Sequence, residues 1–300
     1  GARLDSPLLQ ARAADSYRQL RDGGFNADDR RADFFFLSRL VLRCPASLTA
    51  ASVREVGSED VYFPDYEALV ARGADDHGRY WEFAAKAGSN HEHHNHNDCG
   101  TFILHVDGAP AVMEIGAPEY VRDYFNEQRY TFLAARSAGH SVPRVNGFEQ
   151  AAGEPFDAQV IRTQLTADRV EFAMDLAKSY PAEARCRRLI RTFIFDRRAG
   201  RLIVRDEAEF EGEGTLESAV VADGRVDCGA TGAWIATEAG RLRLTPSNGT
   251  VLTGLDHPEY RNRQEQPATV NRLLLSGGAA AASVKTEYTI EWSGRSRKQW

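Results

Sequence analysis

The sequence lacks several features that would mark particular classes of protein. Its longest apolar stretches, residues 34–37 and 277–282, are far shorter than the roughly 18 residues that a membrane-spanning helix requires. Its four cysteines show no C-x-x-C spacing, which argues against a zinc ribbon and against a thioredoxin-like redox motif. It also contains no G-x-S-x-G elbow and no Walker motif, so serine hydrolysis and nucleotide chemistry are not expected.

The sequence has fewer basic than acidic residues. The 37 lysines and arginines are outnumbered by 43 aspartates and glutamates, which gives a formal net charge of −6. Because nucleic acids and anionic membranes require a basic face, neither is expected as a partner. The chain begins at Gly1, without an initiator methionine or a signal peptide, and we therefore expect a processed or cut N-terminus.

Two regions of different pattern follow one another along the chain. Within residues 5–58, apolar side chains such as Leu9, Ala13 and Leu20 recur at helical spacing. From about Val61 onward, short alternating segments are separated by Gly, Asp and Asn, as in a large antiparallel β domain. The prediction is a mainly β protein, with a short helical segment at 1–58 followed by an antiparallel β-sandwich at 59–300.

Individual strands can be predicted from the alternation of apolar and polar residues. The segment 170–176 alternates as a strand with one buried face should. Asp107-Gly108 is a strong hairpin signal. We expect hairpins that pair 101–106 with 111–115 and 188–196 with 202–210, and further strands at 241–244, 272–275 and 287–292.

A histidine cluster is the most informative part of the sequence, because four of the eight histidines fall within residues 91–96. If the segment is extended, His94, His96 and Asp98 share one face, and Asn95 and Asn97 share the other. A divalent ion needs three or four ligands from separate segments, and zinc favours imidazole with carboxylate. The downstream candidates are Glu114 and His140. A solvated histidine loop, a hydrogen-bonded lone histidine and a plain strand carboxylate remain open as structural alternatives.

The run from His94 to Gly116 resembles the signature of heparinase II/III-type polysaccharide lyases. That family opens its C-terminal sandwich with HNHND, Gly, Ser or Thr and Phe, followed by an Asp-Gly hairpin. The match continues through Tyr120, Phe125 and Arg129, and residues 140–147 resemble the family's H-N-x-P-x-I-N-G. The specific part of the resemblance covers about residues 88–150.

The resemblance implies roles for individual residues. It implies a structural metal ion, in the first instance zinc, held by His96, Glu114 and His140. It also implies a substrate cleft that His94 faces. The further candidates at that cleft are Arg129 and Tyr124 for catalysis and Asn95, Asn97 and Tyr120 for substrate binding. Two departures from the family pattern are Glu114, where the family usually has Asp, and Ser141, where it usually has Asn.

The resemblance also implies a mechanism and a missing part. Lyases of this family cleave uronic-acid polymers by β-elimination, which needs carboxylate neutralisation, a base and an acid. The family's catalytic Tyr lies on an α/α toroid that precedes the sandwich, and this sequence has room only for the tail of that toroid. We therefore expect an acidic polysaccharide substrate, negligible activity of the chain alone, and a missing toroid domain or a homodimer as protein partner. A periplasmic or extracellular location follows from the resemblance only.

Two other classes of function fit parts of the sequence. A non-catalytic carbohydrate-binding or oligomerising sandwich remains open, since a net charge of −6 is no obstacle to a neutral ligand. A cupin-like metal enzyme is disfavoured by spacing: cupins place their Glu a few residues after the second His, whereas Glu114 follows His96 by 18 positions.

Overall fold

The computed structural model describes residues 60–118 and 120–294, and the helices expected within 5–58 lie outside this part of the chain. The described residues form antiparallel strands joined by turns and short 3₁₀ helices, of which the longest is η5 (Glu127–Thr131). The predicted mainly β fold is confirmed. None of the helices in the described ranges is long and apolar enough to cross a membrane.

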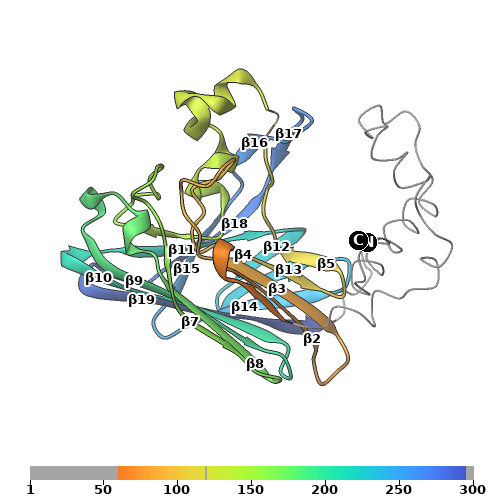
Figure 1. Cartoon of the computed structure of the whole chain (residues 1–300). Coiled ribbons are helices and arrows are strands. Elements are labelled where there is room, and N and C mark those ends of the chain that lie inside the picture. Colours follow the sequence, from red (N-terminus) through yellow and green to blue (C-terminus); the bar gives the residue numbers. More distant parts are fainter. Residues whose placement is uncertain (1–59, 119, 295–300) are drawn as a thin grey trace. The chain divides into compact units, whose positions relative to one another are not determined.

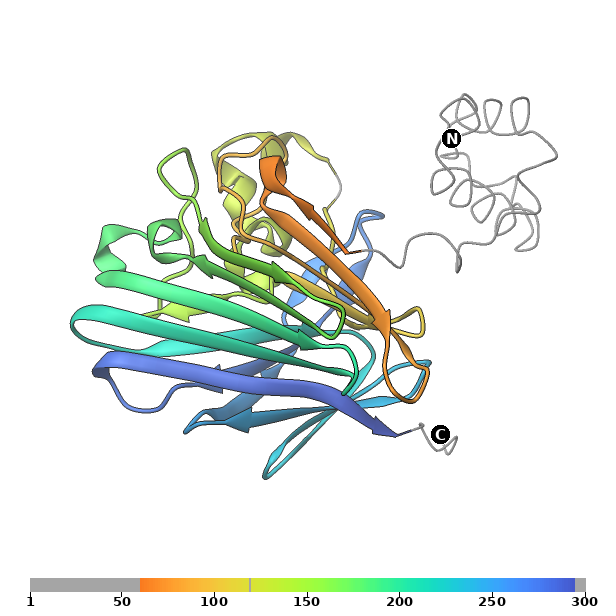
Figure 2. The same ribbon diagram turned by 60° about the horizontal axis from the view of Figure 1, so that its bottom comes forward.

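Two large sheets make up the sandwich (Figures 1 and 2). The first sheet contains, in spatial order, β1 (Val61–Phe63), β2 (Ala68–Ala74), β3 (Tyr80–Lys86), β4 (Phe102–Val106), β5 (Ala109–Val112), β11 (Leu216–Ala222), β18 (Asn271–Ser276) and β15 (Val251–Asp256), and β6 (Pro143–Val145) pairs with β11 outside this order. The second contains β12 (Arg225–Gly229), β13 (Gly232–Ala236), β14 (Arg241–Ser247), β19 (Ala281–Gly294), β10 (Arg201–Gly214), β9 (Cys186–Asp196), β8 (Arg169–Asp175) and β7 (Gln159–Leu165). A separate hairpin is formed by β16 (Glu259–Arg261) and β17 (Pro267–Thr269).

The hydrophobic core lies between the two sheets. Trp81 and Phe83 of β3 meet Phe193 and Phe195 of β9, and all four side chains are fully buried. The ring centroids of Phe83 and Phe193 lie 5.4 Å apart. Aromatic pairs of this kind bury large apolar areas and hold the layers together.

The predicted hairpins are confirmed. β9 pairs with β10, and β4 pairs with β5 across Asp107 and Gly108. These two residues have φ values of 50° and 80°, and a tight hairpin turn requires such left-handed conformations. β5 ends at Val112, earlier than expected, so Glu114 lies just beyond the strand. The other predicted strands fall within β8, β14, β18 and β19.

The connection between β5 and β6 consists of short helices, coloured yellow-green in Figure 1. Small residues allow it to pack tightly: a Cβ atom on Gly139 would lie 2.4 Å from the carbonyl oxygen of Leu133. The Asn126 side chain caps η5 by accepting a hydrogen bond from the backbone N–H of Gln128 at 2.8 Å. The helices of this connection are η4 (Arg122–Phe125), η5, η6 (Leu133–Ala135) and η7 (Ser137–Gly139), and the remaining described ones are η3 (Pro64–Tyr66), η8 (Ala177–Ser179) and η9 (Ala182–Ala184).

A buried arginine of β9 links the second sheet to this connection. Arg191 donates from Nε and Nη2 to the carboxylate of Asp206, at 2.7 and 2.8 Å. Its Nη1 donates to the carbonyl oxygens of Gly100 and Ser141, at 2.8 and 2.5 Å. Both charged side chains are fully buried. A buried charge is tolerated only when it is paired and hydrogen-bonded, so these four contacts hold one another in place.

Replacing this arginine should destabilise the fold strongly. Arg191→Met leaves the Asp206 carboxylate buried without a counter-charge, and the free energy of unfolding should fall by about 3–5 kcal/mol. Urea denaturation followed by circular dichroism measures it. The matched control is Arg188→Met on the same strand, because Arg188 pairs with Glu209 in solvent and its loss should cost at most about 1 kcal/mol. Similar losses for the two variants would contradict the role given to Arg191.

Candidate functional site

The histidine-rich segment is folded into turns, so the condition for a shared face of His94, His96 and Asp98, an extended segment, is not met. The backbone N–H of Asn95 donates to the carbonyl of Glu92 at 3.2 Å, and His94 adopts a left-handed conformation with φ of 58°. A left-handed residue interrupts the alternation of side chains that a strand would produce. His94 is therefore exposed, whereas His96 and Asp98 are at least partly buried.

Three side chains that could hold a metal ion converge next to this turn. One ligand atom from each of His96, Asp98 and His140 lies within 4.8 Å of the other two. The rings of His96 and His140 have centroids 5.1 Å apart. Two hydrogen bonds bring the segments together: the Asn97 N–H donates to the Ala135 carbonyl at 3.0 Å, and the Ser137 hydroxyl donates to the Asn97 carbonyl at 2.7 Å.

Glu114, the predicted carboxylate ligand, contacts His140 but is not one of these three residues. Nδ1 of His140 donates to one carboxylate oxygen of Glu114, and the Thr101 hydroxyl donates to the other. Nε2 of His140 donates to the Ala134 carbonyl at 2.9 Å. Since Nε2 is held by the backbone, a cation that displaced the Nδ1 proton would bind His140 through Nδ1, and a carbonyl partner such as that of Ala134 orients metal-binding histidines in general.

The two histidines of the cluster have opposite pKa shifts. Burial, with the nearby His140, lowers the pKa of His96 to about 4, so this imidazole is neutral at pH 7. Burial also acts to lower the pKa of His140, but the Glu114 carboxylate outweighs it and raises the pKa to about 9. His140 is thus protonated at neutral pH, and a metal ion bound at this place would displace that proton.

The donor atoms present fit a zinc ion. Neutral imidazole and carboxylate are ligands that zinc prefers. Oδ1 of Asp98 has no hydrogen bond among the described residues, although the Lys86 ammonium lies 3.1 Å from it as an ion pair. Burial acts to lower the pKa of Lys86, but Asp98 and Glu92 raise it, so Lys86 remains charged. His96, Asp98, His140 and Glu114 therefore offer four candidate ligands, with Lys86 as a competitor for Asp98.

A recess of about 430 Å³ lies at the surface beside the cluster, and His94, Asn95 and Arg129 line it together with Tyr130. Arg129 donates to the Asn95 carbonyl, and its guanidinium carbon lies 4.5 Å from the ring centroid of Tyr124. Nε of Arg129 has no hydrogen-bond partner among the described residues. The structure thus brings the predicted His94 and Arg129 to one opening.

The remaining predicted residues divide between the surface and the interior. Tyr124 is fully buried, and its hydroxyl lies 2.8 Å from Nε2 of His96. Asn97 is also buried and donates to the Gln150 carbonyl at 3.2 Å. Both side chains therefore support the loop, and their direct roles in catalysis or substrate binding stay predictions. Tyr120 is half exposed and stacks on His94, with ring centroids 5.9 Å apart.

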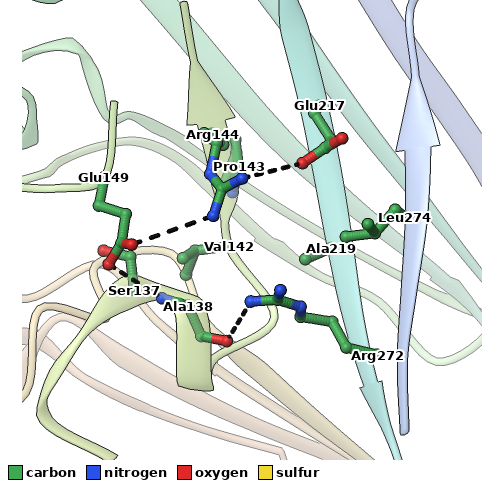
Figure 3. Close-up of a pocket in the computed structure, with 10 residues that line it drawn as sticks. All are labelled: Ser137, Ala138, Val142, Pro143, Arg144, Glu149, Glu217, Ala219, Arg272 and Leu274. Carbon is green, nitrogen blue, oxygen red and sulfur yellow. Dashed lines mark hydrogen bonds and ion pairs between the residues drawn. The ribbon is translucent and has the colours of Figure 1, made fainter. Parts of the chain in front are cut away.

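A second, very small pocket lies against the residues that precede and follow His140 (Figure 3). Arg272 of β18 donates to the Ala138 carbonyl at 2.6 Å, and Arg144 lies between Glu149 and Glu217. The cavity volume of about 10 Å³ accommodates no more than about one water molecule. The hydrogen bond from Arg272 anchors the His140 segment, and the pocket is too small for a sugar.

Sequence reasoning missed two side chains at the site. Lys86 of β3 pairs with Asp98, and the guanidinium carbon of Arg263, beyond β16, lies 5.9 Å from the ring centroid of Tyr120. No motif in the sequence marks Lys86 or Arg263, because each reaches the site from another segment only when the chain folds. The H-x-H-x-D spacing of His94, His96 and Asp98 is the sequence signal for Asp98, whereas the family resemblance points to Glu114 as the carboxylate ligand.

The chain is similar to known proteins over most of its length. A family model described as Heparinase II/III-like, C-terminal, matches residues 59–286. Among solved structures, heparan sulfate lyase HepC from Pedobacter heparinus is similar with a TM-score of 0.67 and 13% identity, over 98% of this chain and 43% of that one. A structure of heparinase III gives a TM-score of 0.65 and 12% identity, over 93% of this chain and 43% of that one.

At such identities these structures show a shared fold, and this chain spans less than half the length of either. A search of curated protein sequences gives no match. The family model, however, covers well over half of the chain. The chain therefore belongs to the heparinase II/III-like C-terminal family.

Proposed function

We propose that this chain is the metal-binding part of a polysaccharide lyase that cleaves uronic-acid-containing glycans by β-elimination, and that it is inactive without an N-terminal toroid domain. The lyase would act in the periplasm or outside the cell. The observation that carries the proposal is the placement of His94 and Arg129 at one recess beside the cluster of His96, Asp98 and His140.

The recess supplies some of the chemistry that β-elimination needs. Arg129 lines the recess and carries a positive charge that can neutralise a uronate carboxylate, which acidifies the proton that must be removed. His94, exposed beside it, is the candidate for proton transfer. Tyr124 positions Arg129, whose guanidinium lies over its ring, and its hydroxyl contacts His96. The toroid would supply the remaining catalytic groups.

Zinc, when bound, would supply a positive charge that ties the histidine-rich turn to the His140 segment. His96 and His140 would hold it with Asp98 or Glu114. Its binding energy would then contribute to the stability of the domain. This chain's own residues orient the ligands: the Ala134 carbonyl fixes the ring of His140, and Tyr124 contacts that of His96.

A carbohydrate-binding function without catalysis is the second candidate. Tyr120 and Phe125 expose 48% and 55% of their surface next to His94. Exposed rings of this size mark interaction surfaces. Glycan binding without product formation, even in the presence of the toroid domain, would favour this function over the first.

Metal removal should loosen the domain. We expect the purified chain to carry about one zinc ion per molecule, and a chelator should lower its thermal midpoint by several degrees because the ion binds only the folded state. His96→Ala should abolish both the metal content and the chelator effect. His91→Ala, an exposed histidine of the same turn, is the matched control and should leave both unchanged. Metal analysis that finds no zinc in the unaltered chain would contradict the proposed site.

Zinc binding should strengthen as the pH rises from 6 to 8. The Glu114 carboxylate raises the pKa of His140 to about 9, so below that pH the ion must displace a proton, whereas His96 is already neutral. Calorimetry in buffers of different ionisation heat should detect release of about one proton per ion. Glu114→Gln removes the source of the shift and should reduce this release. If Glu114→Gln released as many protons per zinc ion as the unaltered chain, the assignment of the released proton to His140 would be contradicted.

Lyase activity should require the toroid domain. Incubated with alginate, heparin, heparan sulfate or chondroitin, the chain alone should produce no ultraviolet absorbance of unsaturated uronates. A longer protein that includes the toroid should produce it, and His94→Ala in that protein should lower the rate by about 10²- to 10⁴-fold. Robust turnover by the chain alone would refute its incompleteness, and full activity of His94→Ala would refute the role of His94.

A further inference from the structure

Two exposed aromatic rings form a surface beside the recess. Tyr120 and Phe125 have ring centroids 5.3 Å apart, and His94 stacks on Tyr120. Tyr124 stacks on Tyr120 as well, with centroids 5.3 Å apart, and joins this surface to the buried part of the site. Aromatic side chains with a few placed polar groups are typical of binding sites for small organic ligands.

Arg263 brings a positive charge to the same surface from the turn between β16 and β17. Its guanidinium carbon lies 5.9 Å from the ring centroid of Tyr120. The side chain is exposed and makes no ion pair with any residue in the described ranges. Since Arg263 and His94 both lie over Tyr120, one oligosaccharide can reach both of them.

The turn that carries Arg263 is held in a defined shape. The Asn262 side-chain oxygen accepts hydrogen bonds from the N–H groups of Gln264 and Gln266, both at 3.0 Å. At its base, Tyr260 packs on a small apolar cluster that includes Ile115 and Ala134. Both ribbon views place this hairpin beside the yellow-green helices that precede β6 (Figures 1 and 2). A preformed turn reduces the entropy lost on binding.

We propose that Arg263, with Tyr120 and Phe125, forms a subsite for an anionic sugar residue adjacent to the residue at His94. The proposal rests on the proposed function and names the place where the charge of the glycan is recognised. In a chain of net charge −6, the exposed guanidinium of Arg263 over Tyr120 supplies the local positive charge that an acidic glycan needs. A guanidinium binds carboxylate or sulfate with two parallel hydrogen bonds.

Calorimetric titration of the 300-residue chain tests this subsite. The probes are hexasaccharides from alginate, which carry carboxylates only, hexasaccharides from heparin, which also carry sulfates, and neutral cellohexaose. Arg263→Gln should weaken binding of at least one acidic probe about tenfold, equivalent to about 1.4 kcal/mol, and leave binding of cellohexaose unchanged. Weaker binding of the alginate probe identifies the carboxylate as the group bound, and a loss confined to heparin identifies the sulfate.

Arg198→Gln is the matched control. It removes the same charge from the turn between β9 and β10, where Arg198 pairs with Asp76 at 3.3 Å, and it should leave both acidic affinities unchanged. Equal thermal midpoints of the variants would show that folding is unaffected. The proposal is overturned if Arg263→Gln binds as tightly as the unaltered chain or if Arg198→Gln loses as much. A surface whose function is to contact another domain would bind no acidic hexasaccharide. The proposal is therefore also overturned if the unaltered chain binds none.

These measurements do not depend on catalysis. If the lyase assay of the longer protein fails while Arg263→Gln still weakens binding, the β-elimination proposal falls and the subsite stands. If the lyase assay succeeds and Arg263→Gln binds normally, the subsite falls and the proposed function stands.

Discussion

The buried guanidinium of Arg191 is the constraint on which the candidate site depends. One of its acceptors, the Gly100 carbonyl, ends the histidine-rich turn, and another, the Ser141 carbonyl, directly follows His140. The second sheet thereby holds both segments that carry His96, Asp98 and His140. Arg272 of the first sheet binds the Ala138 carbonyl on the other side of His140. Because an unpaired buried charge would be costly, these carbonyls have little freedom to move.

The two departures from the family pattern are both accommodated by the surrounding structure. The Ser141 hydroxyl accepts a hydrogen bond from the backbone N–H of Val221 at 2.9 Å, so a short polar side chain satisfies a buried donor there. Glu114 uses both of its oxygens, one toward Thr101 and one toward His140. Its position beyond the end of β5 gives the longer side chain room to reach His140. Within the part of the chain that the structure describes, neither Ser141 nor Glu114 has a buried side-chain oxygen without a hydrogen bond.

The sequence predicted those parts of the molecule that local rules determine. The alternation of apolar and polar residues and the Asp107-Gly108 turn were sufficient to predict strands and hairpins, because register and turn type follow from neighbouring residues. The approach of His96 to His140 followed from the family motif. The left-handed conformation of His94 could not be predicted, since a residue with a side chain adopts it only when surrounding contacts require it. The burial of Tyr124 likewise arises from contacts between distant segments.

The β16–β17 hairpin belongs to neither large sheet, because its two strands pair with each other alone among the described residues. Insertions, deletions or charge reversals at its tip would leave every strand pairing of the sandwich intact. The turn that carries Arg263 can therefore be altered without disturbing the sandwich, whereas the segments on either side of His140 are tied to the two sheets by Arg191 and Arg272.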